Sequence, residues 1–204
     1  MDKPGGQDTA ASRRGPGSEQ TRVRLLRAAA ELIAEQGWGA VRTRAVAERA
    51  GLPHGTVSYH FRGKQELLTE AALYTVARAV PLEGLAGEQG TPPPDLVELI
   101  EGWLTGAETT DPVVAGVGME AMLQAERDPV LRRRLAELMG RYREVMTDLV
   151  ASSQRRRTTT VQTDPAGLAA LLAAIGDGLF LHARIDPELD TEAAITALRD
   201  LLTR

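Results

Sequence analysis

The sequence predicts an all-α protein with a small helical head at its N-terminus and a larger helical body behind it. Ala, Leu, Arg and Glu dominate the 204 residues, whereas aromatic residues make up only 3%, and the dominant types are good helix formers. No segment shows the alternating pattern of β-branched or aromatic and polar residues that is typical of a strand. The hydrophobic fraction of 43% is enough for a packed core. We therefore expect about nine helices and no sheet.

The head is expected to span residues 19–66 and to contain three helices. Apolar residues recur at helical spacing over 21–36, and Gly37 ends this first helix. A second, short helix is predicted over 43–50 and a third over 53–60.

The second and third helices carry the spacing of a helix-turn-helix. Thr43 is a suitable N-cap for the second helix, and Ala47 is small where the two helices would cross. Gly51 permits the tight turn, and Val57 returns an apolar side chain to the preceding helix. This pattern also arises by chance in helical proteins, so by itself it favours a helix-turn-helix without deciding it.

The body is expected to span residues 67–204. A helix from Lys64 to just before Pro81 would join it to the head, and the Pro- and Gly-rich residues 81–94 break the chain after that helix. Three later helices start at an Asp-Pro pair, in which the carboxylate can cap the helix and the proline suits its first turn. These pairs are Asp111-Pro112, Asp128-Pro129 and Asp164-Pro165. The body helices are predicted near 95–108, 112–126, 129–153, 165–184 and 191–203. The basic tract 155–160 is predicted to be an exposed loop.

Composition excludes several kinds of site. There is no cysteine, so disulfides, thiolate metal sites and cysteine nucleophiles are excluded.

Residues 1–18 are polar and lack an apolar run, so we expect a disordered tail and no signal peptide. The longest apolar stretch, 167–183, is interrupted by Asp177 and several glycines, which favours a buried helix over a membrane span. We expect a cytoplasmic protein that does not bind membranes.

Charge is divided unequally along the chain. Residues 1–65 contain eleven Lys and Arg against six Asp and Glu, whereas the remaining residues contain thirteen against twenty-two. A basic head on an acidic body suggests that the head meets a polyanion, although chance clustering would give the same counts.

A specific block of residues lies across the third helix and the start of the fourth. It reads Gly55-Thr56, Tyr59-His60-Phe61, Lys64 and Leu67-Leu68. With this block, the stretch 21–68 resembles the tetracycline-repressor (TetR) family, and the last two helices resemble it more weakly. The resemblance implies a three-helix head whose third helix lies in the major groove of DNA. We therefore predict a sequence-specific transcriptional regulator, in the form of a repressor that a small-molecule effector releases from its operator.

Within this head, the residue types suggest which side chains read bases. His54 lies at the start of the third helix, where an imidazole can hydrogen-bond a purine N7 or a carbonyl. Arg44 can make a bidentate contact to guanine or hold a phosphate, and Gly55 allows the backbone to approach DNA closely. Phe61 is expected in the core, between the third helix and the first.

Hydroxyl and basic side chains around these residues are expected to contact phosphates. Ser58 stands where many family members carry a tyrosine, with Tyr59 directly after it, so either could contact the DNA backbone. Arg42 replaces a common small hydroxyl residue and can add a phosphate contact. The whole predicted DNA-binding set is Arg42, Thr43, Arg44, His54, Gly55, Thr56, Ser58, Tyr59, His60 and Lys64.

An enzyme is the main alternative from another class. It would need a constellation of reactive groups, but the only histidines are His54, His60 and His182, and no metal-binding, nucleophile or phosphate-loop motif is present. We therefore predict no catalytic residue, no metal and no cofactor. A purely architectural DNA-binding protein is a further alternative, and the large acidic body argues against it.

The body is predicted to hold an unidentified apolar or amphipathic small molecule. Aromatic and methionine side chains on the apolar helix faces can line a pocket, although each could instead belong to the core. This candidate set is Trp103, Met119, Met122, Tyr142, Met146 and Phe180.

The last two helices are predicted to form a homodimer interface. Apolar residues cover nearly the whole circumference of the helix 165–184, so it must bury two faces. Residues 191–203 supply an amphipathic partner helix, and two copies would form a four-helix interface with two-fold symmetry. The operator should then be a near-palindrome. The predicted interface residues are Leu168, Leu172, Ile175, Leu179, Ile195, Leu198 and Leu202.

Overall fold

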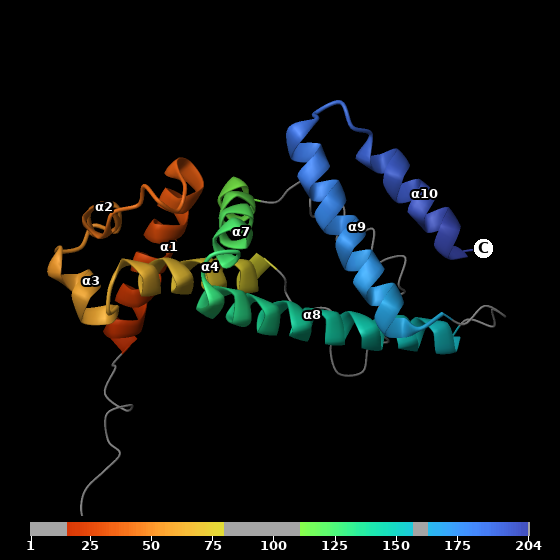
Figure 1. The fold of residues 1–204 in the computed structure, drawn as a ribbon, viewed down its shortest axis with the longest axis horizontal. Helices are drawn as coiled ribbons and strands as arrows, with labels where there is room; N and C mark the ends of the chain where they lie inside the picture. The colour runs from red at the N-terminus through yellow and green to blue at the C-terminus, as the bar shows by residue number, and fades with distance from the viewer. Residues whose placement is uncertain (1–15, 80–110, 157–162, 204) are drawn as a thin grey trace, which may run out of the picture.

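The computed structural model describes residues 16–79, 111–156 and 163–203, and every regular element in these ranges is a helix. This confirms the predicted all-α class. The described helices are α1 (Pro16–Gln36), α2 (Thr43–Arg49), α3 (Gly55–His60), α4 (Lys64–Ala79), α7 (Pro112–Ala125), α8 (Pro129–Arg156), α9 (Pro165–Ile185) and α10 (Thr191–Thr203). Figure 1 shows α1 to α3 at one end of the molecule and the long α8 running to the other end, where α9 and α10 lie. The predicted helix 95–108 and loop 81–94 lie outside the described residues.

The first helix is longer than the sequence pattern predicted. It begins at Pro16, because a proline suits the first helical turn, where its missing N–H costs nothing. Residues 16–18 are therefore helical, and their assignment to a disordered tail was wrong. Gly37 ends the helix as predicted, with a positive φ of 79° that glycine adopts without strain.

The helix-turn-helix has the predicted order with different boundaries. Arg42 is the N-cap of α2 and makes no capping hydrogen bond through its side chain, so the prediction of Thr43 as the cap was wrong. Gly51 follows α2 with a φ of 63°, and the N–H of Leu52 donates to the carbonyl of Ala47 at 2.9 Å. This is the tight turn that the glycine predicted. The third helix begins at Gly55, two residues after the predicted start.

The Asp-Pro pairs start their helices as predicted. Asp111 Oδ1 accepts from the N–H of Val113 at 2.9 Å, and Asp128 Oδ1 accepts from two N–H groups of the first turn of α8. Asp164 Oδ2 accepts from the N–H of Gly167 at 2.8 Å. Each carboxylate thus satisfies N–H groups that the helix itself leaves free. At its other end α8 continues to Arg156, so residues 155 and 156 lie in its last turn and were wrongly predicted as loop.

The hydrophobic core is continuous from the head into the body. One cluster includes Leu25 and Ile33 of α1, Val57 of α3, Leu67 of α4 and Val117 of α7, and none of these side chains is more than 4% exposed. A second cluster at the far end of α8 joins that helix to α9 and α10. The core therefore passes without a break across residues 66 and 67, where the sequence pattern divided the head from the body.

In the described part of the chain, α9 is the single helix long and apolar enough to cross a membrane. One of its faces packs against α8 through Ala169, Leu172 and Gly176, which are buried. The opposite face is exposed and carries Leu171 and Ile185, at 62% and 73% exposure. The helix is thus only half covered, whereas the sequence predicted a buried one.

Candidate nucleic-acid interface

The predicted DNA-binding residues lie together on the outer surface of α2, α3 and the start of α4. Figure 1 shows these elements at the end of the molecule far from α9 and α10. None of the ten residues is buried: four are half-buried and the other six are exposed. The opposite faces of the same helices supply Val46, Ala47 and Val57 to the core. The packing of α2 and α3 thus fixes which side chains face outward.

The third helix, α3, presents an aromatic side chain to solvent. Tyr59 is 80% exposed, and its ring meets the ring of His60 edge-on, with 5.0 Å between centroids. The Ser58 hydroxyl donates to the carbonyl of Gly55 at 2.9 Å. Because this hydrogen bond occupies the Ser58 proton, Tyr59 is the better placed of the two to donate to a phosphate.

Lys64 connects the start of α4 to the turn after α1. Its Nζ donates to the carbonyl of Gly39 at 2.7 Å. An ammonium has three N–H donors, so this contact leaves two for a phosphate. The predicted phosphate contact and this structural contact are therefore compatible.

Three arginines outside the predicted DNA-binding set make contacts that stabilise the head. Arg24 donates to the carbonyl of Ala50 at 2.6 Å and so supports the turn between α2 and α3. Arg49 holds the two oxygens of Glu35 at 2.8 and 2.7 Å, and its hydrogen bonds lower the pKa of the Glu35 carboxyl. Phe61 lies in the core as predicted, at 3% exposure, with the Arg22 guanidinium 5.5 Å from the centre of its ring.

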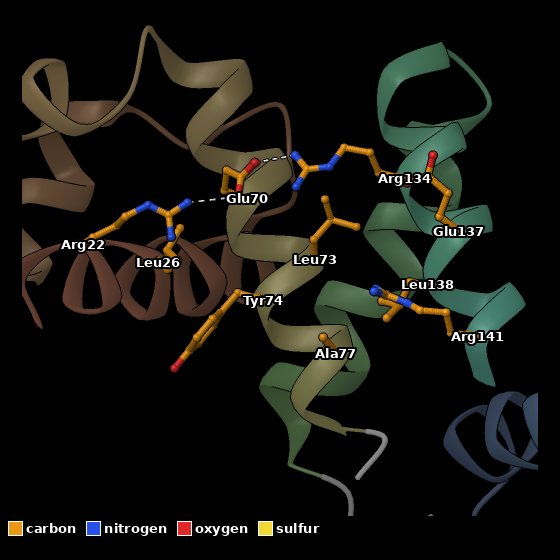
Figure 2. Close-up of a pocket in the computed structure, with 10 residues that line it drawn as sticks. All are labelled: Arg22, Leu26, Glu70, Leu73, Tyr74, Ala77, Arg134, Glu137, Leu138 and Arg141. Carbon is orange, nitrogen blue, oxygen red and sulfur yellow. Dashed lines mark hydrogen bonds and ion pairs between the residues drawn. The ribbon is translucent and has the colours of Figure 1, made fainter. Parts of the chain in front are cut away.

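Polar contacts that the sequence pattern did not reveal tie the head to the body. Figure 2 shows Glu70 of α4 between two arginines. Arg22 of α1 lies at 3.0 Å, and Arg134 of α8 donates a hydrogen bond to the other carboxylate oxygen. Burial opposes ionisation of Glu70, but the hydrogen bonds and positive charges of the two arginines outweigh it and lower the pKa of the carboxyl. The only sign of these ion pairs in the sequence was that Glu70 stands next to the apolar positions of its helix. Its partners lie 48 and 64 residues away in sequence, so no local pattern could identify them.

The helix α7, which belongs to the first core cluster, also contacts the end of α1 and the residues after it. Glu120 Oε2 accepts from the backbone N–H of Trp38 at 2.8 Å. Four residues earlier on α7, Gly116 lies against Ala34 so closely that a Cβ added there would be 3.0 Å from the Ala34 Cβ. Residues four apart share a helix face. Gly116 and Glu120 therefore lie on one face of α7, and this face contacts the C-terminal end of α1 and the residues that follow it.

The structure does not bring the predicted ligand-pocket residues together. Tyr142 and Met146 are buried in the second core cluster, where burial, together with the charge of Asp177, raises the pKa of Tyr142 to about 12. Met119 and Met122 are 39% and 56% exposed on α7. Trp103 lies outside the described residues, and Phe180 is half-buried on α9. Two pockets among the described residues are lined by other side chains.

The predicted dimer residues lie mostly on the inner face of α9 and α10. Leu172 and Ile195 are only 2% and 9% exposed, so their assignment to an outer interface was wrong, because both side chains pack into the second core cluster. The half-buried members pack against the same cluster: Leu168, Leu179, Leu198 and Leu202. Ile175 is exposed, and its place in the interface stays a prediction. Helical periodicity showed that α9 has two apolar faces without showing which one turns inward.

Two family models match the chain over most of its length. The model of bacterial regulatory proteins of the tetR family matches residues 25–71, and the model of the C-terminal domain of BetI-type transcriptional repressors matches residues 92–204. The chain belongs to the TetR family of transcriptional regulators. This TetR-family membership makes it a DNA-binding regulator and not an enzyme, as predicted.

Relatives agree with the TetR-family assignment. An uncharacterized HTH-type transcriptional regulator of Mycobacterium tuberculosis is 26% identical over 187 residues, which cover 91% of this chain and 94% of that protein. A putative regulator from Streptomyces coelicolor has a TM-score of 0.68 at 28% identity, covering 91% of this chain and 99% of its own. A putative regulator from Saccharomonospora viridis, solved in complex with choline, has a TM-score of 0.75 at 22% identity and covers 91% and 97%. At that identity the last likeness shows the fold alone.

The Glu70 ion pairs predict how acid affects this TetR-family protein. Because the carboxyl has a lowered pKa in the folded state, its stabilisation is complete above the unfolded value and is lost as the pH falls through the folded value. We expect Glu70→Gln to lower the free energy of unfolding by about 1–2 kcal/mol at pH 7, since the pair is only partly shielded from solvent. In urea titrations the difference should begin to shrink as the pH falls below about 4.3, the ordinary pKa of a glutamate, and should vanish below the lowered pKa of Glu70. Glu144→Gln, at an exposed α8 glutamate without an ion pair in the described residues, is the control. An equal loss at every pH would contradict the assignment.

Proposed function

We propose that this TetR-family regulator is a dimeric repressor that reads a near-palindromic operator through α3. The proposal rests on the position of the ten predicted DNA-binding residues on α2, α3 and the start of α4. All ten residues are accessible, while Val57 and Phe61 lock α3 onto the core from the other side. A rigid helix with an accessible polar face is the element that can enter a major groove.

Selection of bound DNA from a random pool, followed by titration of variants, tests this role of α3. We expect His54→Ala or Arg44→Ala to relax base preference at one position, with a loss of about 1–3 kcal/mol on the selected operator. Lys64→Ala should weaken binding to all sequences and flatten the salt dependence, because a phosphate contact carries no sequence information. Arg143→Ala removes the same charge from exposed α8 and is the control. If His54→Ala changes neither the affinity nor the selected consensus, α3 is not the recognition helix.

The dimer is proposed to form through the outer face of α9. Leu171, Ile175 and Ile185 line that face, and the exposed Leu201 lies on the neighbouring α10. An exposed apolar strip of this length is typical of a protein interface, and a second copy supplies an identical strip around a two-fold axis.

The opposite face of α9 packs against α8, which favours a place for this helix in the folded body over one in a membrane. A DNA-binding regulator of this kind acts in the cytoplasm.

The repressor is proposed to respond to a small apolar or amphipathic effector. Support comes from the fold, since a structural neighbour from Saccharomonospora viridis was solved with choline, and a FadR from Bacillus subtilis was solved with stearoyl-CoA. Tyr142 and Met146 belong to the second core cluster, so the proposed lining of a body pocket is reduced to Trp103, Met119, Met122 and Phe180.

Tryptophan fluorescence can locate that effector. Trp38 is 5% exposed and its Nε1 has no hydrogen-bond partner among the described residues, so Trp38→Phe removes an unsatisfied donor and leaves Trp103 as the sole indole. A ligand that releases operator DNA should shift Trp103 emission, and Met122→Ala should alter ligand affinity without altering operator affinity. A releasing ligand that leaves Trp103 unchanged and competes with DNA at the head would refute the body pocket.

A further inference from the structure

A separate groove lies where α1, α4 and α8 meet, next to the ties between the head and the body. Its volume is about 310 Å³, which is in the range of small-molecule sites. Figure 2 shows the labelled side chains around it, with α1 on one side, α4 in the middle and α8 on the other side. Leu73 and Ala77 of α4 and Leu138 of α8 form apolar surface, and Arg134 and Arg141 lie beside it.

The two α8 arginines are seven residues apart, two turns along the same helix face. Arg141 makes no hydrogen bond or ion pair within the described residues. Arg134 contacts Glu70 through Nη1, and a guanidinium has further N–H donors. Arginine N–H groups beside an apolar surface match a carboxylate on an apolar molecule.

The charges that line the groove favour an anion over a cation. Arg22, Arg134 and Arg141 stand against two carboxylates, Glu70 and Glu137, so the groove keeps a net positive charge.

Of the two carboxylates, Glu70 is already held by arginines, and Glu137 makes no ion pair within the described residues. The ring of Tyr74, the one aromatic residue of the lining, already lies against the guanidinium of Arg78, 5.5 Å from its centre. A cation could therefore pair only with Glu137, which lies between two arginines on the same helix, whereas an anion finds unused N–H donors on both of them.

We propose that this groove is an effector site for an amphipathic carboxylate, a small organic acid with an apolar tail. The carboxylate binds Arg134 and Arg141, and the tail lies on Leu73 and Leu138. The site is distinct from the proposed body pocket, because none of the residues proposed for that pocket lines it.

The groove is connected to the recognition helix by contacts already described. Arg134 holds Glu70, Glu70 holds Arg22, and the Arg22 guanidinium lies over Phe61, the residue that ends α3. A carboxylate bound to the remaining N–H groups of Arg134 shares the positive charge of that guanidinium with Glu70 and so weakens one tie between α4 and α8. A ligand shifts the equilibrium between two arrangements of a protein when it binds one of them better. Here the ligand favours the arrangement in which the Glu70–Arg134 contact between α4 and α8 is weakened. This step rests on the proposed function, and it predicts lower operator affinity when the groove is occupied.

Calorimetric titration of the full chain at pH 7 tests the site with three carboxylates: octanoate, decanoate and 4-phenylbutyrate. We expect saturable binding of at least one. Arg141→Gln should weaken it about ten-fold or more through loss of a charged hydrogen bond. Ala77→Trp should weaken it by filling the groove from an exposed position. Arg143→Gln, which removes a charge from an exposed α8 position outside the groove, should leave it unchanged. Decanol and decyltrimethylammonium test whether the carboxylate is needed, and both should bind weakly.

Three results would overturn the site: none of the carboxylates binds, decyltrimethylammonium binds as tightly as decanoate, or Arg141→Gln behaves like Arg143→Gln. Titration of the selected operator then tests regulation. A bound carboxylate should weaken the complex, and Arg141→Gln and Arg22→Met should each abolish the effect. An operator complex that a bound carboxylate leaves unchanged would refute the regulatory step. If no operator can be selected, the proposed function fails, while the calorimetry still decides whether the groove is a site.

Discussion

Ile175→Glu is expected to convert the proposed dimer into a monomer that binds its operator weakly. Ile175 is 37% exposed and lies one turn after the exposed Leu171 on α9. In a two-fold interface each copy would bury the new carboxylate next to its symmetry mate, and two buried like charges without partners are strongly unfavourable. A glutamate is a good helix former, so α9 itself should persist.

Sedimentation at micromolar concentration measures the first effect and operator titration the second. Binding through two linked heads gains about 10²–10⁴ in affinity over one head, so the monomer should lose a factor of that size on the full operator. Its affinity for an isolated half-site should be unchanged. Ala166→Glu places the same charge at an exposed position in the first turn of α9, and it should remain dimeric. An Ile175→Glu protein that sediments as a dimer would show that this face is not the interface.

Local patterns predicted the helices and caps well because their physical causes are local. The Asp-Pro pairs at 111, 128 and 164 each place a capping carboxylate next to a residue suited to a first turn, and all three cap their helices in the structure. Gly51 was identified in the same way, because a tight turn after α2 needs a positive φ. Apolar periodicity also separated the accessible polar side of α2 and α3 from the core.

The contacts between distant elements could not be predicted. Glu70, Arg22 and Arg134 are ordinary charged residues on three different helices, and the sequence does not show that these helices converge. For α9, apolar residues on all sides predicted two covered faces, but the packing of α8 against Leu172 decides which face is inside. The predicted interface set therefore mixed the inner face with the outer one. Gly116 and Glu120 were not distinguished from other helical residues, because their role depends on the close approach of α7 to α1.

The structure gives α7 a larger role than the sequence pattern indicated. From the sequence, the helix that begins at Lys64 was the only element expected to join the head to the body. In the structure α7 packs along α1, and Gly116 and Glu120 fix it against Ala34 and Trp38. The head can then change its orientation only if α1 also moves relative to α7. A change that separates α1 from α7 should therefore affect both stability and DNA binding.

Gly116→Leu makes this separation. A Cβ at residue 116 would lie 3.0 Å from the Cβ and 3.1 Å from the Cα of Ala34, and the second of these is a backbone atom that cannot rotate away. We expect the larger side chain to push α7 from α1 and to lower the free energy of unfolding by about 1–3 kcal/mol, as for other overpacked cores. The hydrogen bond from Trp38 to Glu120, one turn along α7, should be weakened with it, and operator affinity should fall because the head loses its fixed orientation.

Gly118→Leu is the matched control, since a Cβ at residue 118 meets no atom within 4 Å. Replacement of a glycine inside a helix should there stabilise the protein by about 0.5–1 kcal/mol through helix propensity alone. Urea denaturation and operator titration of the two variants separate the packing against α1 from this propensity effect. Gly116→Ala combined with Ala34→Gly should recover part of the stability that Gly116→Ala loses, because the double variant removes the clash between the two side chains but keeps the close approach to the backbone of residue 34. If Gly116→Leu and Gly118→Leu unfold at the same urea concentration and bind the operator equally, α7 does not hold the head through Gly116.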